Sequence, residues 1–242
     1  MSGIYYAIGG ANYQAKESIE IDLDILNEIK KNQLKPSVLY IGVALCDDYK
    51  QISTFKSYYE ELGFQVDVLY SHNLDLKEED ILNAMLNHNV IYFGGGITSR
   101  LISFAKKYNI YDKIIKCFEN NKIIAGVSAG AIMLFSYGFG DKEAFVDNFL
   151  SVNHKMTNGL GIFSATFCPH YQNSGGIFFH NEVKNYKSNG FAVENGAALK
   201  IYKDSFEIIK SSRSNVFMFD ESNNYKLVHL KNDIIYDIDL LK

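Results

Sequence analysis

The chain has 242 residues, of which 47 % are hydrophobic, and it carries a formal net charge of -4. This length and composition suit a globular protein with one large domain or two small ones around a buried core. Acidic and basic residues are interspersed, without the basic stripe that is typical of nucleic-acid binding, so no nucleic-acid partner is expected.

The first half of the chain alternates apolar runs of strand length with amphipathic helical stripes. Strands are predicted at Ile4–Ile8, Val38–Ala44, Gln65–Tyr70 and Val90–Phe93. Helices are predicted at Ile19–Ile29, from Asp47 or Asp48 to about Leu62, and at Leu76–Leu86, Thr98–Lys107 and Ile110–Phe118. This rhythm indicates an α/β fold with a mostly parallel sheet flanked by helices, whose functional loops lie at the carboxyl ends of the strands.

The next apolar run begins at Ile123 and reaches a turn of small residues around one serine. The stretch Gly126-Val127-Ser128-Ala129-Gly130 fits the G-x-S-x-G pattern of a nucleophile elbow between a strand and a helix. Such a turn exposes the serine at a helix N-terminus, where free N–H groups and the helix dipole can stabilise an oxyanion. The alternative is a plain turn in which Ser128 only caps the helix.

Beyond Leu134 the chain is richer in β-structure. Short strand-like segments, divided by Gly, Asn, Ser and Asp turns, are predicted within Gly159–Tyr171, Gly190–Tyr202, Phe206–Lys210, Val216–Phe219 and Tyr225–His229. A helix is expected only at Ile177–Tyr186. No linker or repeat separates the two halves, so residues 1–242 are predicted to form a single domain with a β-rich C-terminal third.

The cysteines and histidines show no metal-binding pattern. Three widely spaced cysteines, Cys46, Cys117 and Cys168, lack a C-x-x-C pair, and the six histidines lack H-x-x-x-H or H-E-x-x-H spacing. No metal and no other cofactor is therefore expected. The amino terminus does not resemble a signal peptide and no apolar run approaches membrane length, so we expect a cytoplasmic protein without a membrane partner.

A nucleophilic serine needs a base within hydrogen-bond reach and a third group that orients this base. The best candidate is His170, which ends a strand-like run directly after Pro169. His154 and His180 are weaker competitors, and for any of them a structural role is the alternative.

Four stretches, in order across about residues 90 to 200, resemble the peptidase E family of serine peptidases, which includes aspartyl dipeptidases and cyanophycinase. They are Tyr92-Phe93-Gly94-Gly95-Gly96-Ile97-Thr98, the elbow with Ala131, Gly159-Leu160-Gly161 leading to Cys168-Pro169-His170-Tyr171, and 191–199, Phe-Ala-Val-Glu-Asn-Gly-Ala-Ala-Leu. The resemblance implies a three-layer sandwich like that of class I glutamine amidotransferases.

The resemblance also implies roles for individual residues. Ser128 would attack the peptide carbonyl and His170 would act as its base. The oxyanion hole would be formed by the backbone N–H of Ala129 and by an N–H from the Gly95-Gly96 loop.

The third member of the expected Ser-His-acid triad has two candidates. The motif around Gly196 places an acid at Glu194, in the segment after His170. A second acid of the family lies a dozen or more residues after the serine, where Asp141 is the nearest match and Glu143 and Asp147 are alternates. For each of them a solvated acid without a catalytic role is the alternative.

The chain departs from the family at two points. Ile97 replaces the asparagine of the G-G-N-T loop, which should not affect an oxyanion hole made of backbone. The arginine with which aspartyl dipeptidases bind a substrate aspartate is absent, since no arginine occurs between His170 and Arg213. Strict aspartate specificity is therefore not expected. Lys184 or Lys187 could replace the arginine, or the neighbouring phenylalanines at 178 and 179 could make the pocket apolar.

These observations predict a serine peptidase that hydrolyses short, dipeptide-like substrates through an acyl-enzyme. A non-catalytic module that binds a small peptide or amino acid is the alternative. A glutaminase would need a cysteine at the elbow, and Cys117 and Cys168 are misplaced for that. Some of the 17 tyrosines would suit a homodimer face.

Overall fold

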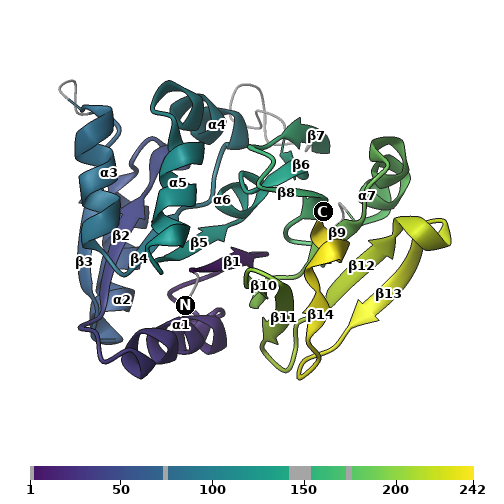
Figure 1. Cartoon of the computed structure of the whole chain (residues 1–242), viewed down its shortest axis with the longest axis horizontal. Coiled ribbons are helices and arrows are strands. Elements are labelled where there is room, and N and C mark those ends of the chain that lie inside the picture. The colour runs from purple at the N-terminus through teal and green to yellow at the C-terminus, as the bar shows by residue number, and fades with distance from the viewer. Residues whose placement is uncertain (1–2, 73–75, 142–153, 173–175) are drawn as a thin grey trace.

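The computed structural model describes residues 3–72, 76–141, 154–172 and 176–242. In this part of the chain the strands form an eight-stranded sheet, in the order β14-β11-β10-β1-β5-β4-β2-β3, and a six-stranded sheet, in the order β13-β12-β9-β8-β6-β7. Figure 1 shows the helix-flanked strands on the left and the C-terminal strands with α7 on the right.

Five parallel strands make up one half of the eight-stranded sheet. They are β1 (Ile4–Ile8), β2 (Ser37–Ile41), β3 (Gln65–Leu69), β4 (Val90–Phe93) and β5 (Ile123–Val127). β1, β2, β4 and β5 are short and almost entirely apolar, as expected for parallel strands that are covered on both faces, whereas the edge strand β3 alternates exposed and buried residues. β5 lies between β1 and β4, so Ser128, the residue that follows it, is flanked by a strand on each side.

Helices cover both faces of this parallel half. One face packs against α1 (Ile19–Lys31) and α2 (Tyr49–Glu61), whose buried residues share a core with Tyr6 and Tyr92. The other face packs against α3 (Glu78–Asn87), α4 (Thr98–Lys107) and α5 (Ile110–Glu119), which share a core with Phe93 and Ile124. Leu26 and Ile29 of the apolar stripe predicted for the first helix are buried, but Leu23, which belongs to the same predicted stripe, is 42 % exposed, and Ile21 and Ile25 are buried in its place.

The other half of the eight-stranded sheet is antiparallel. β10 (Ala197–Ile201) pairs with β1, β11 (Ser205–Lys210) pairs with β10, and β14 (Tyr236–Asp237) closes the edge. The expectation of a mostly parallel sheet is therefore too simple, because both sheets are mixed. The α/β class itself is correct.

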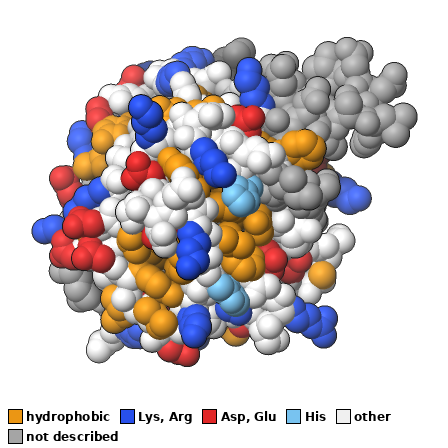
Figure 2. Space-filling view, turned by 90° about the vertical axis from the view of Figure 1, so that its right-hand side faces the viewer, with side chains coloured by type: hydrophobic (Ala, Val, Ile, Leu, Met, Phe, Trp, Pro, Cys, Tyr) orange, Lys and Arg blue, Asp and Glu red, His pale blue; other side chains and the backbone are white. Residues whose placement is uncertain are grey.

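The six-stranded sheet combines the middle of the chain with its C-terminal part. Its strands are β6 (Phe135–Asp141), β7 (His154–Asn158), β8 (Phe163–Cys168), β9 (Gly190–Val193), β12 (Val216–Asp220) and β13 (Lys226–Leu230). One face shares a core with the first sheet through Phe167 and Phe191. The other packs against α7 (Gly176–Val183) through Phe179. Figure 2 shows hydrophobic side chains gathered on the α7, β12 and β13 side, with histidine and basic side chains among them.

Two sequence predictions differ from the structure near the elbow. The second strand ends at Ile41, and the short 3-10 helix η1 (Val43–Leu45) follows it. The helix after the elbow, α6 (Ala129–Ile132), has only four residues, and the chain then enters β6. β6 and β7 were not expected from the sequence. The remaining 3-10 turns are η2 (Lys184–Tyr186), η3 (Glu221–Asn223) and η4 (Ile238–Leu241).

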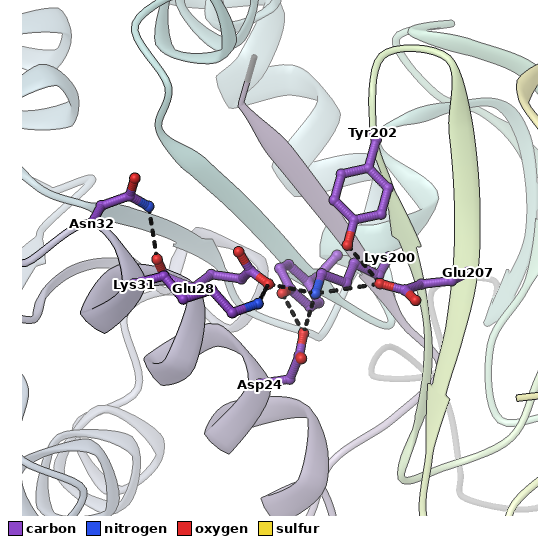
Figure 3. Close-up of polar contacts among 8 residues, drawn as sticks. Asp24, Glu28, Lys31, Asn32, Lys200, Tyr202 and Glu207 are labelled. Carbon is purple, nitrogen blue, oxygen red and sulfur yellow. Dashed lines mark hydrogen bonds and ion pairs between the residues drawn. The ribbon is translucent and has the colours of Figure 1, made fainter. Parts of the chain in front are cut away.

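A buried lysine joins α1 to the antiparallel half of the sheet (Figure 3). The Lys200 side chain on β10 is 3 % exposed, and its Nζ lies 2.8 Å from Asp24, 2.9 Å from Glu28 and 3.4 Å from Glu207. Burial opposes the charge, but the hydrogen bonds to Asp24 and Glu28 outweigh it and raise the pKa of Lys200. Tyr202 donates a hydrogen bond to Glu207 in the same cluster.

A buried carboxylate joins α1 to α2 on the same face of the sheet. Asp22 is fully buried and accepts hydrogen bonds from Tyr59 at 2.6 Å and from Tyr58 and Ser18 at 2.8 Å. Burial raises the pKa of Asp22 to about 6, although the three hydrogen bonds oppose this shift.

Candidate active site

Ser128 occupies a strained turn at the carboxyl end of the central strand β5. Its backbone has φ 54° and ψ -111°, a conformation that is rare for a residue with a side chain. The turn is held by the Ser128 N–H, which donates to Ile8 O at 3.0 Å, and by the Ser128 carbonyl, which accepts from Ile132. This geometry is that of a nucleophile elbow.

The two glycines of the G-x-S-x-G motif are required by close backbone contacts. A Cβ atom at Gly126 would lie 2.3 Å from Gly130 O, and a Cβ atom at Gly130 would lie 2.1 Å from Phe93 O. Any side chain at either position would therefore push the strand and the turn apart. α6 is a single turn, so the helix dipole contributes little at Ser128.

His170 is the base candidate that the structure places against the serine. It follows β8 with a positive φ of 52°, and its N–H donates to Gly9 O at 3.2 Å. Its Nε2 atom lies 2.9 Å from Ser128 Oγ, within hydrogen-bond distance. Gly9, in the loop after the first strand, thus positions a residue that is 161 positions away in the sequence.

The other ring nitrogen of His170 contacts a residue that the sequence did not indicate. Its Nδ1 atom lies 2.6 Å from Oδ1 of Asn195, in the connection between β9 and β10. Asn195 also forms an isolated parallel bridge with Gly10. The described contacts therefore arrange Ser128, His170 and Asn195 in a row.

The predicted acids lie elsewhere or outside the described contacts. Glu194 accepts hydrogen bonds from the backbone N–H of Asn215 at 2.7 Å and from its side-chain amide at 3.1 Å. The position against His170 Nδ1 that was expected for this acid is held by its neighbour Asn195. Asp141 ends β6, but its side chain is outside the described part of the chain, as are Glu143 and Asp147.

The glycine loop after β4 lies against the serine. A Cβ atom at Gly95 would be 3.2 Å from Ser128 Cβ and 3.8 Å from Ser128 Oγ. The loop is fixed from both ends, since Gly94 donates to Ile41 O at 3.0 Å and Ile97 donates to Ala44 O at 2.9 Å. The N–H groups of Gly95 and Gly96 lie between these anchors, on the same sheet edge as the N–H of Ala129.

Two of the three cysteines are buried in the protein interior. Cys117 and Cys168 are buried, and burial raises the pKa of Cys117 to about 11 and raises that of Cys168 as well. Cys46 is exposed. Within the described residues, no group of three or more His, Cys, Asp or Glu side chains is placed to hold a metal ion.

The residues considered for substrate specificity are spread out. Phe179 is buried in the core beneath α7, whereas Phe178 is 60 % exposed. Arg213 lines a cavity of about 530 Å³ together with Gln172 and Asn195. In the described contacts, Arg213 does not touch Ser128.

An α/β fold with a strained serine at the end of its central strand and a histidine hydrogen-bonded to it defines a serine hydrolase of the elbow type. Comparison with known proteins specifies the family: residues 6–209 match the model of peptidase family S51, so the chain belongs to this family, the peptidase E family of serine peptidases. It is therefore a peptidase of the serine class.

Individual relatives agree with this assignment. The uncharacterised peptidase YgaJ of Bacillus subtilis (strain 168) is 28 % identical over 214 residues, which cover 86 % of this chain and 87 % of the relative. The crystal structure of a peptidase from an acI-B1 Actinobacterium superimposes with a TM-score of 0.73 at 18 % identity, covering 98 % of this chain and 97 % of the other.

A candidate peptidase E protein from Listeria monocytogenes EGD-e superimposes with a TM-score of 0.63 at 17 % identity, covering 88 % of this chain and all of the other. At these identities the structural likenesses show the fold. Among the helices of the described residues, none is long and apolar enough to cross a membrane.

Proposed function

We propose that this chain hydrolyses short peptides, with Ser128 as the nucleophile and His170 as the general base. The observation that carries the proposal is the 2.9 Å contact between Ser128 Oγ and His170 Nε2 at a strained elbow. A serine is a weak nucleophile until a base accepts its proton, and this contact is the geometry that the transfer requires.

The reaction would run in two halves. Ser128 Oγ attacks the peptide carbonyl carbon while its proton passes to His170 Nε2, and the oxyanion accepts hydrogen bonds from Ala129 and from Gly95 or Gly96. When the tetrahedral intermediate collapses, His170 returns the proton to the leaving amine and an acyl-enzyme remains. A water molecule then attacks the ester with His170 again as the base, which releases the acid product and restores Ser128.

The substrates would be short peptides without a strict requirement for an amino-terminal aspartate. A bound carboxylate is best recognised by an arginine that contacts it with two hydrogen bonds, and the expected position after His170 has none. The cytoplasmic location and a homodimer stay predictions of the sequence.

The nucleophile can be tested without knowing the substrate. A fluorophosphonate probe should label the folded protein on Ser128, as identified by mass spectrometry of the adduct, and the S128A variant should remain unlabelled. An unlabelled wild-type protein, or labelling that persists in S128A, would contradict the mechanism.

Turnover of a dipeptide library separates the peptidase from the non-catalytic binding module. Cleavage of one or more dipeptides that is lost in S128A supports the peptidase and gives its preference. Binding without any cleavage would favour the module.

A further inference from the structure

A cavity of about 570 Å³ lies at the edge of the parallel strands opposite to Ser128. Its lining includes Ile4, which begins β1, Ile123, which begins β5, and Asn89, which directly precedes β4. Ser128 follows the other end of β5, roughly 17 Å away at about 3.3 Å per strand residue. The cavity has the size of a small-molecule site and is separate from the candidate active site.

We propose that this cavity binds the carboxyl-terminal end of a short apolar peptide, with the terminal carboxylate next to Lys122. Three properties of the lining side chains support this ligand: one uncompensated positive charge, an apolar floor and several free carboxamide groups. The inference does not depend on the proposed roles of Ser128 and His170.

The charges around the cavity favour an anionic ligand. Glu28 and Lys122 are the two charged residues that line it. The carboxylate of Glu28 is already compensated, because the Nζ atoms of Lys31 and Lys200 lie 2.7 Å and 2.9 Å from it (Figure 3). Lys122 has no acidic partner among the described residues, and burial lowers its pKa. A carboxylate bound next to Lys122 would offset this loss of hydration.

Apolar side chains form the floor of the cavity. Ile29 and Ile123 are 2 % and 5 % exposed, and Ile4 packs against the same core. Leu34, in the connection between α1 and β2, also lines the cavity, but it is 51 % exposed. An apolar side chain of a ligand would remove this surface from water, which favours binding.

Four asparagine side chains in the lining retain free carboxamide groups. The Nδ2 atoms of Asn32 and Asn120 each donate to a main-chain carbonyl at 2.8 Å, which leaves their Oδ1 atoms free. Asn89 is the reverse, since its Oδ1 accepts from Ser37 and its Nδ2 is free. The side chain of Asn121 has no hydrogen bond within the described part of the chain. A peptide group offers one donor and one acceptor, so this mixture of acceptors and donors matches a peptide main chain.

The same lining disfavours a free amino acid. Its ammonium group would need an acidic partner, and the carboxylate of Glu28 is engaged with two lysines. A peptide that is acylated at its amino end, or the end of a longer chain, brings only its carboxylate into the cavity. Its single charge therefore fits the single unpaired ammonium group of Lys122.

Calorimetric titration with N-acetyl-leucyl-leucine tests the site, and the S128A background prevents hydrolysis of the probe. We expect one peptide to bind per chain. The carboxyl-terminal amide of the same peptide should bind about tenfold more weakly or worse, because it lacks the charge that Lys122 recognises. The added substitution K122Q should weaken binding of the acid by a similar factor, and L34S by about threefold. K116Q, which removes an exposed lysine of α5 outside the cavity, should bind like S128A alone.

Equal affinity for the acid and the amide, or equal affinity of K122Q and K116Q for the acid, would overturn the proposal. The absence of binding up to the solubility limit of the probe would do the same. Equal unfolding midpoints in urea for K122Q and K116Q would show that the affinities do not reflect misfolding.

Nuclear magnetic resonance locates the bound peptide. The backbone amide resonances of residues 120–123 should shift during the titration, whereas shifts confined to the surroundings of Ser128 and His170 would contradict the site. Fluorophosphonate labelling of Ser128 should be equal in the wild type and K122Q. If the wild type binds the probe in this cavity but Ser128 is not labelled, the proposed function fails and the peptide site stands.

Discussion

Single atoms decide the geometry around Ser128, and the glycines show this best. Gly130 and Gly10 both lack room for a Cβ atom, but they face different neighbours. At Gly130 the obstacle is the backbone carbonyl of Phe93, which is fixed in the central sheet. At Gly10 the obstacles are the side chains of Asn195 and His170, which can rotate. The same substitution should therefore have different consequences at the two positions.

G10A should fold and lose activity. The new methyl group would turn Asn195 and His170 out of their contact, so labelling of Ser128 should fall by about tenfold or more. The unfolding free energy, measured in urea, should change by less than about 1 kcal/mol, because only side chains are displaced.

G130A should lose stability first. The methyl group would have to displace the backbone of β4, and we expect a cost of about 2–4 kcal/mol in the unfolding free energy. If G10A and G130A had the same ratio of lost activity to lost stability, the distinction between the two contacts would be wrong.

The sequence predicted the local motifs of the site, but it did not predict the contact between His170 and Asn195. Ser128 and the glycine loop were predicted from local turn motifs, and His170 was predicted from its place at the end of a strand-like run and from the family resemblance. Asn195 was missed because an asparagine beside a glutamate carries no local signal for orienting a histidine. Which of two adjacent residues faces the site depends on the register of β9 and β10, which only the folded sheets define.

The secondary-structure elements are joined by polar clusters as well as by the apolar core. α1 contributes to two of them, the Lys200 cluster toward β10 and β11 and the Asp22 cluster toward α2. Removing one partner of a buried ion pair leaves the opposite charges uncompensated, whereas exposed pairs contribute little.

K200M should destabilise the protein by on the order of 3 kcal/mol, because Asp24, Glu28 and Glu207 would lose their common counter-charge. Lys31 is a matched control: its Nζ also lies 2.7 Å from Glu28, but its side chain is 66 % exposed. K31M should cost less than about 1 kcal/mol. Urea unfolding of both variants measures the difference, and equal costs would contradict the role of burial.

The elements of the first half of the chain were predicted within a few residues, because parallel strands and amphipathic helices carry local periodicity. The C-terminal strands were also located, but not their assignment to two sheets. β6 was missed because Gly138 and Gly140 interrupt its apolar pattern. Both glycines pack against Ile132, since a Cβ atom would lie 2.3 Å from it at Gly138 and 3.0 Å from it at Gly140. Sheet membership is set by long-range packing, which no window of sequence contains.

On the scale of the whole molecule, the buried Asp22 should make stability depend on pH. Its pKa in the folded protein is about 6, above the ordinary value of 3.8. A carboxyl group with a raised pKa favours folding when it is protonated, so its contribution is fully present below about pH 4 and is lost as the pH rises through 6.

D22N should remove this contribution. Between about pH 4 and pH 6, the wild type should lose stability relative to D22N by up to about 1.4 kcal/mol per pH unit. Urea unfolding at several pH values from 4 to 7.5 gives the difference between the two proteins, in which other titrating groups cancel. Parallel curves, or a wild type that gains on D22N with rising pH, would show that Asp22 titrates normally.

Ser128 belongs to the eight-stranded sheet, His170 follows a strand of the six-stranded sheet, and Asn195 lies in the connection between the two. The eight-stranded sheet is itself completed by β10, β11 and β14, which all follow Asn195 in the chain. Until synthesis has passed Asn195, Ser128 therefore lacks the hydrogen-bonded row that it forms with His170 and Asn195 in the folded protein. The proposed activity thus requires both sheets to be complete.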